Sequence, residues 1–400
     1  MRILIDALSV LPGENGGGET YVRGLLNALA EVDHDNEYRI AVTPRNRDIF
    51  AGGHDNFHLD VIHINNHSRF LRVMYEQLLL PFWGKWLKSD VIHFPANMIP
   101  VILPWLNIPS VVTIHDLSPM FYLRELPEYF PKWKGSFLAG LYKYAGRHAS
   151  VVTTVSNFSR RELITHAGVP GEKIFVASPG SLQSWPANGD SDVALRRYGI
   201  VRPYVLTIGR THKHKNFDTF VVAFARAKRR FQFPHRLLLA GHPGSGHEDV
   251  LRAIRAEGAE DFVHITGYVD QADLPNLYGA SDLFAMPSLY EGFGFPVLEA
   301  MLLGVPTLSS NLCSLPEVGG EATMYVDPHD IESMVAALGQ VLSDSQLRRQ
   351  LSERGKAQAA RASWRNLATE TLKIYRIAAA SKGKGCLSEK FQIQGSESLK

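Results

Sequence analysis

Cysteine is scarce in this sequence: Cys313 and Cys386 are the two among 400 residues. Their spacing indicates neither a metal-binding motif nor a disulfide framework, which favours a reducing compartment. Long apolar runs are missing as well, because no stretch approaches about 18 residues without a charge or a proline, and we predict no membrane-spanning helix. The chain opens on the strand-like MRILIDA, so we expect no signal peptide and a cytoplasmic location.

Net charge is also small. The formal value is +2 at pH 7, which argues against a nucleic-acid-binding protein. The sequence has neither a Walker-type phosphate loop nor the G-x-G-x-x-G fingerprint, which disfavours a Rossmann dehydrogenase. What is present is the composition of an ordinary globular protein, 45% hydrophobic and 20% charged, at a length that suits two domains.

Apolar β-branched runs alternate with longer amphipathic stretches, which is typical of a parallel sheet covered by helices. In the first half we expect strands at Arg2–Asp6, Tyr38–Thr43, Phe57–Ile64, Asp90–Phe94, Ser110–His115, Val151–Val155 and Lys173–Ala177, and helices at Thr20–Glu31, Leu71–Lys88, Lys132–Arg147 and Asn157–His166. In the second half we expect strands at Tyr204–Ile208, Arg236–Ala240, Phe262–Thr266, Leu283–Met286 and Pro306–Ser309, and helices at Phe217–Arg230, Asp330–Ser343 and Ser345–Arg361. The pattern predicts an α/β fold.

The stretch around residues 178–200 is rich in proline and glycine and has no periodicity, so we place an interdomain linker at 181–200. The first domain is then 1–180 and the second 201–361. Residues 381–400 are polar and aperiodic, which predicts a disordered tail. Asp190-Ser191-Asp192 resembles a D-x-D metal motif, but within a linker we interpret it as a solvated turn and predict no metal site.

The segment Ser288–Gly304 (SLYEGFGFPVLEAMLLG) follows a short apolar run that we predict to be a buried strand. Gly292 and Gly294 allow the chain to turn tightly and to lie close to a ligand. Pro296 suits the first position of a helix, which we expect to end at Leu303. The segment therefore reads as strand, glycine-bearing loop and helix.

A helix N-terminus behind such a loop presents free N–H groups and a partial positive charge, which suit phosphate oxygens. Glu291 in the loop and Glu299, expected in the first helical turn, can both face one ligand. Carboxylates accept hydrogen bonds from hydroxyl groups, so the pattern indicates a nucleotide-sugar. The spacing alone fits equally well a solvated Glu291 and a Glu299 that complements the helix dipole.

This segment resembles the signature of the family 4 glycosyltransferases, which has two glutamates separated by seven residues. The matching residues are Glu291, Gly292, Phe293, Gly294, Pro296, Glu299, Ala300, Met301, Gly304 and Pro306. The resemblance implies the GT-B fold, with two Rossmann-like doubly wound parallel-sheet domains that face a cleft. The first domain would bind the acceptor and the second the nucleotide-sugar, and a helix at residues 364–379 would cross back onto the first domain.

Two loops gain a role from the resemblance. Gly16, Gly17 and Gly18 let the backbone approach a ligand closely, and the family has a glycine-rich loop here that faces the donor. Arg210 and Lys215 follow a strand and match in type and spacing the basic pair of the family. Taken alone, the first loop fits a flexible surface loop and the second a solvated basic turn. His212, Lys213 and His214 lie outside the correspondence, and we expect them to be solvated.

His115 and Asp116 end the strand that starts at Ser110, and ligands gather at the carboxyl ends of strands in open α/β sheets. A lone histidine there is more often structural. The family, however, has a histidine near the donor sugar at this point, and HDLS followed by PEYF resembles its mannosyltransferase-like members. Asp116 would fix the histidine tautomer or cap the next turn.

The resemblance implies a role for each site residue. Arg210 and Lys215 would neutralise the leaving diphosphate, Glu291 and His115 would hold the donor sugar, and the remaining residues would bind the rest of the donor. The predicted set is Arg210, Lys215, Glu291 and His115 as catalytic residues, and Glu299 (on the ribose), Gly16, Gly17, Gly18, Gly294, Phe295, Val297, Leu298, Gly209 and Asp116 as donor-binding residues.

We predict a retaining, metal-independent glycosyltransferase without a cofactor, which transfers a hexosyl group from a nucleotide-sugar to a glycan or lipid-linked acceptor. GDP-mannose is the favoured donor, and a UDP-sugar is the alternative. A nucleotide-sugar-binding protein without transfer activity and a GT-B epimerase are the rival functions. Product analysis with and without an acceptor separates the three.

Two helical segments, Leu71–Lys88 and Lys132–Arg147, mix aromatic residues and leucines with basic side chains. The basic residues in and beside them are Arg69, Arg72, Lys85, Lys88, Lys132, Lys134, Lys143 and Arg147. The pattern favours amphipathic helices that pack on their own sheet and leave the lysines in solvent. Peripheral contact with the anionic inner membrane face is the alternative.

Overall fold

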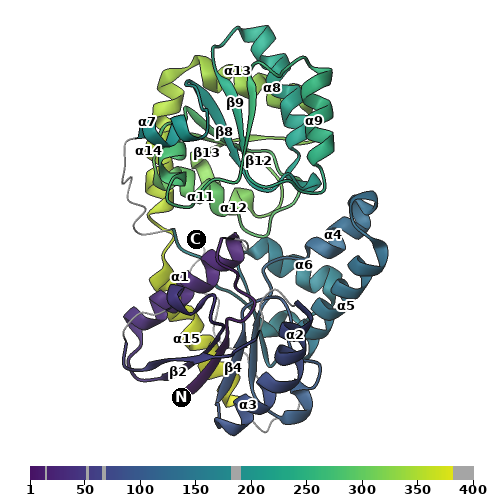
Figure 1. The fold of residues 1–400 in the computed structure, drawn as a ribbon, viewed down its shortest axis with the longest axis vertical. Helices are drawn as coiled ribbons and strands as arrows, with labels where there is room; N and C mark the ends of the chain where they lie inside the picture. The colour runs from purple at the N-terminus through teal and green to yellow at the C-terminus, as the bar shows by residue number, and fades with distance from the viewer. Residues whose placement is uncertain (14–15, 51–53, 65–68, 182–190, 382–400) are drawn as a thin grey trace.

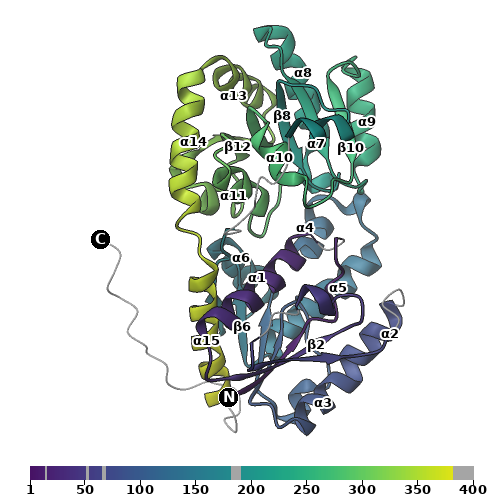
Figure 2. The same cartoon turned by 60° about the vertical axis from the view of Figure 1, so that its left-hand side comes forward.

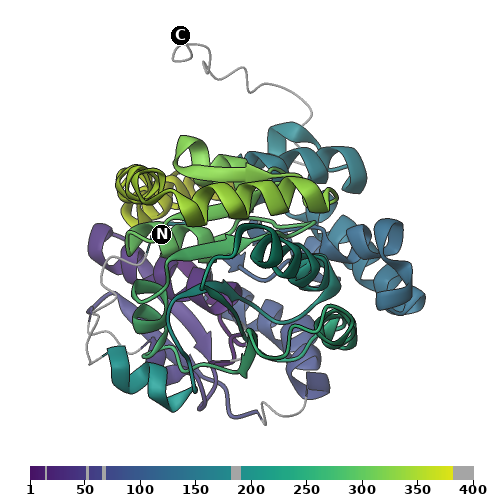
Figure 3. The same cartoon turned by 90° about the horizontal axis from the view of Figure 1, so that it is seen from above.

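A computed structural model describes residues 1–13, 16–50, 54–64, 69–181 and 191–381 of the chain. The described residues form two parallel sheets, each with helices on its faces, in two domains stacked along the long axis of the molecule (Figure 1). Viewed from above, the second domain lies over the first (Figure 3). The predicted α/β class with two doubly wound sheets is confirmed.

The first sheet has seven strands in the described part of the chain, all parallel, in the order β3-β2-β1-β4-β5-β6-β7. Their bounds are β1 Arg2–Asp6, β2 Glu37–Val42, β3 Phe57–Val61, β4 Val91–Phe94, β5 Ser110–Thr113, β6 Val151–Thr154 and β7 Ile174–Val176. The central strands β1, β4, β5 and β6 are buried almost throughout and rich in valine and isoleucine, as a sheet covered on both faces requires.

The second sheet has six described strands, again all parallel, in the order β10-β9-β8-β11-β12-β13. Their bounds are β8 Tyr204–Ile208, β9 Arg236–Ala240, β10 Val263–Gly267, β11 Leu283–Met286, β12 Thr307–Ser310 and β13 Thr323–Val326. In both sheets the strand order reverses beside the first strand, between β1 and β4 and between β8 and β11. Ligand sites form at the carboxyl ends of strands at such a switch point.

Helices cover both sheets. In the first domain they are α1 Gly17–Val32, α2 Arg69–Met74, α3 Leu80–Trp86, α4 Ser118–Glu125, α5 Lys132–His148 and α6 Asn157–Ala167. In the second they are α7 Ser191–Arg197, α8 Phe217–Phe231, α9 His247–Ala256, α10 Leu274–Gly279, α11 Phe295–Leu302, α12 Leu315–Gly319, α13 Ile331–Ser343 and α14 Ser345–Ala359, and α15 Trp364–Ala380 follows. The short turns are η1 Arg47–Ile49, η2 Tyr75–Leu79, η3 Leu103–Leu106, η4 Pro127–Tyr129, η5 Gly171–Lys173, η6 Lys213–Lys215 and η7 Gly320–Ala322.

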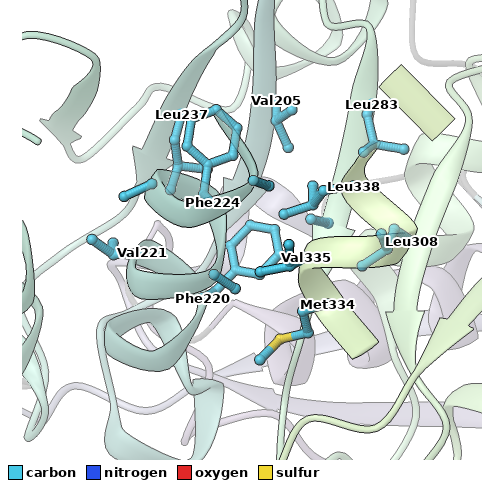
Figure 4. Close-up of a cluster of buried hydrophobic side chains, with 14 of the residues drawn as sticks. Val205, Phe220, Val221, Phe224, Leu237, Leu283, Leu308, Met334, Val335 and Leu338 are labelled. Atoms are coloured by element: carbon cyan, nitrogen blue, oxygen red, sulfur yellow. The ribbon is translucent and has the colours of Figure 1, made fainter. Parts of the chain in front are cut away.

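The core of the second domain lies between its sheet and helices α8 and α13. Phe220 and Phe224 of α8 point toward Val335 and Leu338 of α13, and all four side chains are fully buried or nearly so (Figure 4). Large aromatic side chains in close-packed surroundings hold the helices at fixed positions on the sheet. The loops that follow β8 and β11 therefore project from a rigid support.

Helix α15 follows the second domain but packs on the first. Figure 2 shows it descending beside α1, and Trp364, Leu367, Ile374 and Tyr375 are buried in the core that contains β1 and α1. Where the chain crosses between domains, the Ser181 amide donates to the Ala362 carbonyl at 3.2 Å. The two crossing segments are therefore tied together.

Two predictions about the chain were wrong, and one strand was missed. The helix expected over 71–88 is divided into α2, the π-helical turn η2 and α3, because Pro81 lacks the N–H that a continuous α-helix needs. The linker expected over 181–200 contains α7, whose Ala194 and Leu195 are buried in the second domain. Strand β13 was not predicted. The rest of that linker (182–190) and the expected disordered tail from residue 382 lie outside the described residues.

Candidate active site

A cavity of about 610 Å³ lies between the two domains, at the carboxyl ends of both sheets. Its first-domain wall consists of Gly13, Gly16, Gly17, Gly18, Glu19, Thr20, Asn97, His115, Asp116 and Val155. Its second-domain wall consists of Ile208, Gly209, Arg210, His212, His214, Lys215, Ala240, Gly241, His242, Tyr268, Val269, Gln271, Leu274, Glu291, Gly292, Phe293, Gly294, Phe295, Pro296 and Glu299. The structure thus brings together the predicted basic pair, both glutamates, the histidine and the glycine-rich loop.

The loop before α11 turns at Gly294, whose φ of 123° is a conformation that other residues rarely adopt. Phe295 begins the helix and Pro296 lies in its first turn, so the helix N-terminus opens onto the cavity. Glu299 lies beyond the first turn rather than in it, and it still reaches the cavity wall. The carboxylate and the helix N-terminus therefore border the same space.

Val297 and Leu298 do not line the cavity, unlike the other predicted donor-binding residues. Their side chains are buried in the core of the second domain, and their amides donate to the Gly294 carbonyl at 3.0 and 3.3 Å. A helix that must pack on its own sheet buries one side, and these two residues lie on that side. The prediction that they contact the donor is not supported by this placement.

Lys215 and Glu291 form an ion pair on the second-domain wall of the cavity. The Lys215 ammonium donates to Glu291 Oε1 at 2.6 Å, and the side chains are 15% and 12% exposed. An ammonium has three donors, so Lys215 can hold Glu291 and a phosphate oxygen at the same time. Arg210 lies on the same wall, two positions beyond β8. The ion pair therefore holds the Lys215 ammonium and the Glu291 carboxylate side by side in the cavity wall.

His115 is held in a defined state by its surroundings. Its ring Nε2 lies 2.8 Å from the Pro95 carbonyl, which can only accept, so Nε2 carries the proton. Burial lowers the pKa of His115, and the ring is therefore neutral at pH 7 with Nδ1 as an acceptor. The Tyr21 ring packs edge-on against it at 4.7 Å. This fits a histidine that accepts a hydrogen bond from a hydroxyl group.

Asp116 caps the next turn and does not fix the His115 tautomer. Its Oδ1 accepts from the Ser118 amide at 2.8 Å, at the start of α4. Of the two roles considered for Asp116, the structure supports the cap. Asn216, the residue before α8, makes no cap hydrogen bond, and its side chain donates to the Pro328 carbonyl.

The glycine-rich loop lies opposite α11. Gly16 has a φ of 51° and precedes α1, which starts at Gly17. A Cβ atom on Gly17 would lie 3.2 Å from the Phe295 ring, so the two domains come close together here. The N-termini of α1 and α11 both border the cavity, and their partial positive charges add to those of Arg210 and Lys215.

Sequence reasoning missed the environment of Glu299. The Tyr278 hydroxyl donates to Glu299 Oε2 at 2.8 Å. Burial raises the pKa of Glu299 to about 7, and the hydrogen bond from Tyr278 opposes that rise. Tyr278 lies on α10, 21 residues earlier in the chain, and no local pattern indicates the contact.

His212 and His214 were expected to be solvated, and that was wrong. Both line the cavity, and burial lowers the pKa of each ring. His214 Nδ1 lies 2.8 Å from the Tyr122 hydroxyl of the first domain. Lys213 is paired with Asp218 instead of lying free in solvent. These residues surround Lys215 with defined contacts.

The domains meet in close contact beside the cavity. The Ser156 hydroxyl donates to the Gly292 carbonyl at 2.7 Å, and the Tyr290 hydroxyl accepts from the Leu117 amide at 3.0 Å. Glu317 of the second domain accepts from the Asn157 amide at 2.8 Å, at the N-terminus of α6. These bonds hold the two walls of the cavity against each other.

Within the residues that the structure describes, no group of three or more histidine, cysteine, aspartate or glutamate side chains is placed to hold a metal ion. In the same residues, no helix combines the length and apolar character that crossing a bilayer requires.

Comparisons with known proteins follow the same division into two halves. The family model described as Glycosyltransferase Family 4 matches residues 15–180, and the model described as Glycosyl transferases group 1 matches residues 199–358. The O-antigen chain mannosyltransferase B of Escherichia coli is 32% identical over 329 residues, which cover 78% of this chain and 84% of that protein.

A second relative and one solved structure cover nearly the whole chain. The MMP alpha-(1->4)-mannosyltransferase of Mycolicibacterium hassiacum is 26% identical over 405 residues, 91% of this chain and 95% of that protein. The structure of sucrose-phosphate synthase from Thermosynechococcus elongatus superposes with a TM-score of 0.74 at 20% identity, covering 95% of this chain and 100% of that one. That similarity concerns the fold.

Proposed function

The chain belongs to glycosyltransferase family 4 and is a glycosyltransferase with the GT-B fold, and on that basis we propose that it transfers mannose from GDP-mannose to a glycan or lipid-linked acceptor. Two relatives that cover most of the chain are mannosyltransferases by name, which favours mannose as the transferred sugar. The observation that carries the proposal is the Lys215–Glu291 pair, which lies beside a helix N-terminus in a cavity between two domains.

In the proposed reaction the bond between the sugar C1 and the diphosphate oxygen breaks, and a bond from C1 to the acceptor oxygen forms on the same face. The acceptor proton moves to the departing diphosphate. The anomeric configuration is retained because the new bond forms on the face that the diphosphate leaves. Negative charge grows on the diphosphate as it leaves. Arg210, Lys215 and the N-terminus of α11 border the cavity where that charge would develop. Removing one such preorganised donor typically costs about 3–4 kcal/mol.

The other residues would hold the donor in place. The Glu291 carboxylate would accept from sugar hydroxyls while it holds Lys215, and neutral His115 would accept from a further hydroxyl through Nδ1. Glu299 would accept from the ribose. The contacts between the domains would keep water out of the cavity and so limit hydrolysis of the donor.

We propose that the fixed positive charges perform the role that a divalent cation has in other transferases, so that no metal is required. The test is transfer of labelled mannose from GDP-mannose, with and without EDTA. We expect GDP and GDP-mannose to raise the melting temperature more than UDP and UDP-glucose, and transfer to continue in EDTA. If a UDP-sugar raises the melting temperature more and serves as the donor, the donor is a UDP-sugar and not GDP-mannose. Loss of transfer in EDTA would overturn metal independence.

The proposed acceptor is a growing glycan, either free or linked to a lipid. For a lipid-linked acceptor the enzyme would work at the inner membrane face from the cytoplasm. A nucleotide-sugar-binding protein without transfer activity would give the same thermal shifts. Such a binding protein would leave the labelled sugar on the nucleotide with every acceptor tested, whereas a transferase would move the sugar to the acceptor.

We expect donor binding to depend on pH through Glu299. With a pKa of about 7 the side chain is mostly protonated at about pH 6 and mostly ionised at about pH 8. If the carboxylate is the form that accepts from both ribose hydroxyls, the affinity for GDP-mannose should rise about tenfold over that range, because the competent fraction rises by that factor. Calorimetric titration with GDP-mannose measures this affinity. GDP-mannose is the suitable ligand because its diphosphate has no proton that titrates near neutrality.

Two variants control this expectation. Glu299→Gln should bind more weakly and lose most of the pH dependence. Tyr278→Phe removes the donor to Glu299 Oε2, which should raise the pKa of Glu299 and move the profile to higher pH. An unchanged affinity across the pH range in the unsubstituted protein contradicts the assignment of Glu299 to the ribose.

A further inference from the structure

The first domain exposes large apolar side chains on one side. Across the described residues, ten of the fifteen exposed large apolar side chains lie on α2, η2, α3, η3, α5 and the turn before η3. They are Leu71, Met74, Leu78, Leu79, Phe82, Trp86, Val101, Trp105, Trp133 and Phe137, which we call the aromatic face. Its three tryptophans are 71%, 77% and 75% exposed, in chain order. Soluble proteins seldom leave so many large apolar groups in water without a partner.

Hydrogen bonds connect the elements that carry the aromatic face. The Val101 amide donates to Gln77 Oε1 at 3.0 Å, and the Tyr144 hydroxyl of α5 donates to the Val101 carbonyl at 2.6 Å. Along α5, residues 133, 137, 140 and 144 follow helical spacing and lie on one side of the helix. In Figure 1, α2 and α5 lie on the right-hand side of the first domain and α3 lies at its lower end. The hydrogen bonds therefore place η2, the turn before η3 and the end of α5 that carries Tyr144 side by side.

The charges on the aromatic face are predominantly basic. Segments 71–88, 101–107 and 132–148 contain one acidic residue, Glu76, and it is paired with Arg72 at 3.4 Å. Lys85, Lys88 and Lys132 are exposed among the apolar groups. The whole chain has a net charge of only +2, so this basic character is local.

We propose that the aromatic face binds an anionic lipid bilayer. Exposed tryptophans beside lysines suit the boundary between headgroups and acyl chains, where the rings enter and the ammonium groups remain with the phosphates. A second copy of this chain fits less well, because the basic side chains of two such faces would oppose each other. The surface goes beyond the sequence prediction, which favoured helices packed on their own sheet with solvated lysines.

One end of the aromatic face lies close in sequence to the cavity wall. Phe130, three residues before Trp133, stacks on Tyr122 at 5.5 Å, and the Tyr122 hydroxyl contacts His214 on the cavity wall. A chain docked on a bilayer by this face would have one rim of the cavity near the lipid. This step rests on the proposed function, since it concerns a lipid-linked acceptor, whereas bilayer binding itself does not depend on catalysis.

Flotation of the full chain with vesicles tests the proposal. We expect the protein to float with phosphatidylcholine vesicles that contain phosphatidylglycerol, and to float much less with pure phosphatidylcholine. Each basic side chain near an anionic surface contributes about fivefold in partition. Trp105→Ser with Trp133→Ser should lower partition into the anionic vesicles at least about tenfold. Val201→Ser, which removes an exposed apolar group from the second domain, should change nothing.

Several results would overturn the proposal. These are no flotation with anionic vesicles, equal flotation with both vesicle types, and full flotation of the double tryptophan variant. A concentration-dependent dimer that the double variant abolishes would assign the face to a second copy instead. Transfer to a soluble acceptor is measured in parallel. The substituted tryptophans lie outside the cavity, so an active variant that no longer floats separates the failure of membrane binding from the failure of the proposed function.

Discussion

Replacing Lys215 by methionine should lower turnover roughly a thousandfold, because it removes a preorganised cation from the leaving diphosphate. The same change leaves the Glu291 carboxylate, 12% exposed, without its partner. An unpaired charge in such a position typically costs about 3 kcal/mol or more of the free energy of unfolding. Steady-state kinetics measure the first effect and urea unfolding the second.

The double variant Lys215→Met with Glu291→Met separates catalysis from stability. It leaves no unpaired charge, so most of the lost free energy of unfolding should return, whereas turnover should stay low. Lys373→Met serves as the matched control. It breaks the exposed pair with Glu370 and should change stability by less than about 1 kcal/mol without affecting turnover. Near-normal turnover in the Lys215 variant would exclude this site.

Gly292→Ala should have the second largest effect, through the fit between the domains. A Cβ atom at this position would lie 2.5 Å from the His115 carbonyl oxygen and 2.8 Å from the Asp116 Cβ atom. The contacted carbonyl is fixed at the end of β5, so the domains must separate. A misplacement of about 1 Å at a reacting centre can lower a rate about a hundredfold, and we expect a loss of that size in kcat.

Binding of GDP to the second domain should survive this change, because most of the groups assigned to the nucleotide lie on that domain. An affinity within about threefold of the unsubstituted value, together with an unchanged melting temperature, would place the defect in domain closure. Gly279→Ala is the control, since nothing lies within 4 Å of a Cβ atom there. Full activity in Gly292→Ala would show that the observed contact is not needed for transfer.

The fold could be predicted because its strands are short apolar runs bounded by turn residues. Arg2–Asp6, Tyr204–Ile208 and Leu283–Met286 were predicted with the bounds that the structure shows. Strand β13 was not predicted because it is a short strand at the edge of the sheet, where its pairing with β12 follows from the tertiary fold. Helix α7 escaped because its burial depends on two apolar residues in a polar segment.

The residue types of the site could be named from the motif, but their contacts could not. Lys215 and Glu291 are 76 residues apart, and their pairing depends on how β8 and β11 lie side by side in the sheet. His214 reaches a tyrosine of the other domain, which no local pattern reveals. The raised pKa of Glu299 arises from burial, which follows from tertiary packing.

Helix α15 has a consequence for how the protein folds during synthesis. Its buried side chains complete the core around β1 and α1, although they are the last described residues to leave the ribosome. The core of the first domain therefore stays incomplete, with part of its apolar surface in solvent, until the second domain and α15 have been synthesised. The first domain is synthesised first but its core is completed last. A fragment that stops before residue 364 would expose the apolar surface that α15 covers, and exposed apolar surface promotes aggregation.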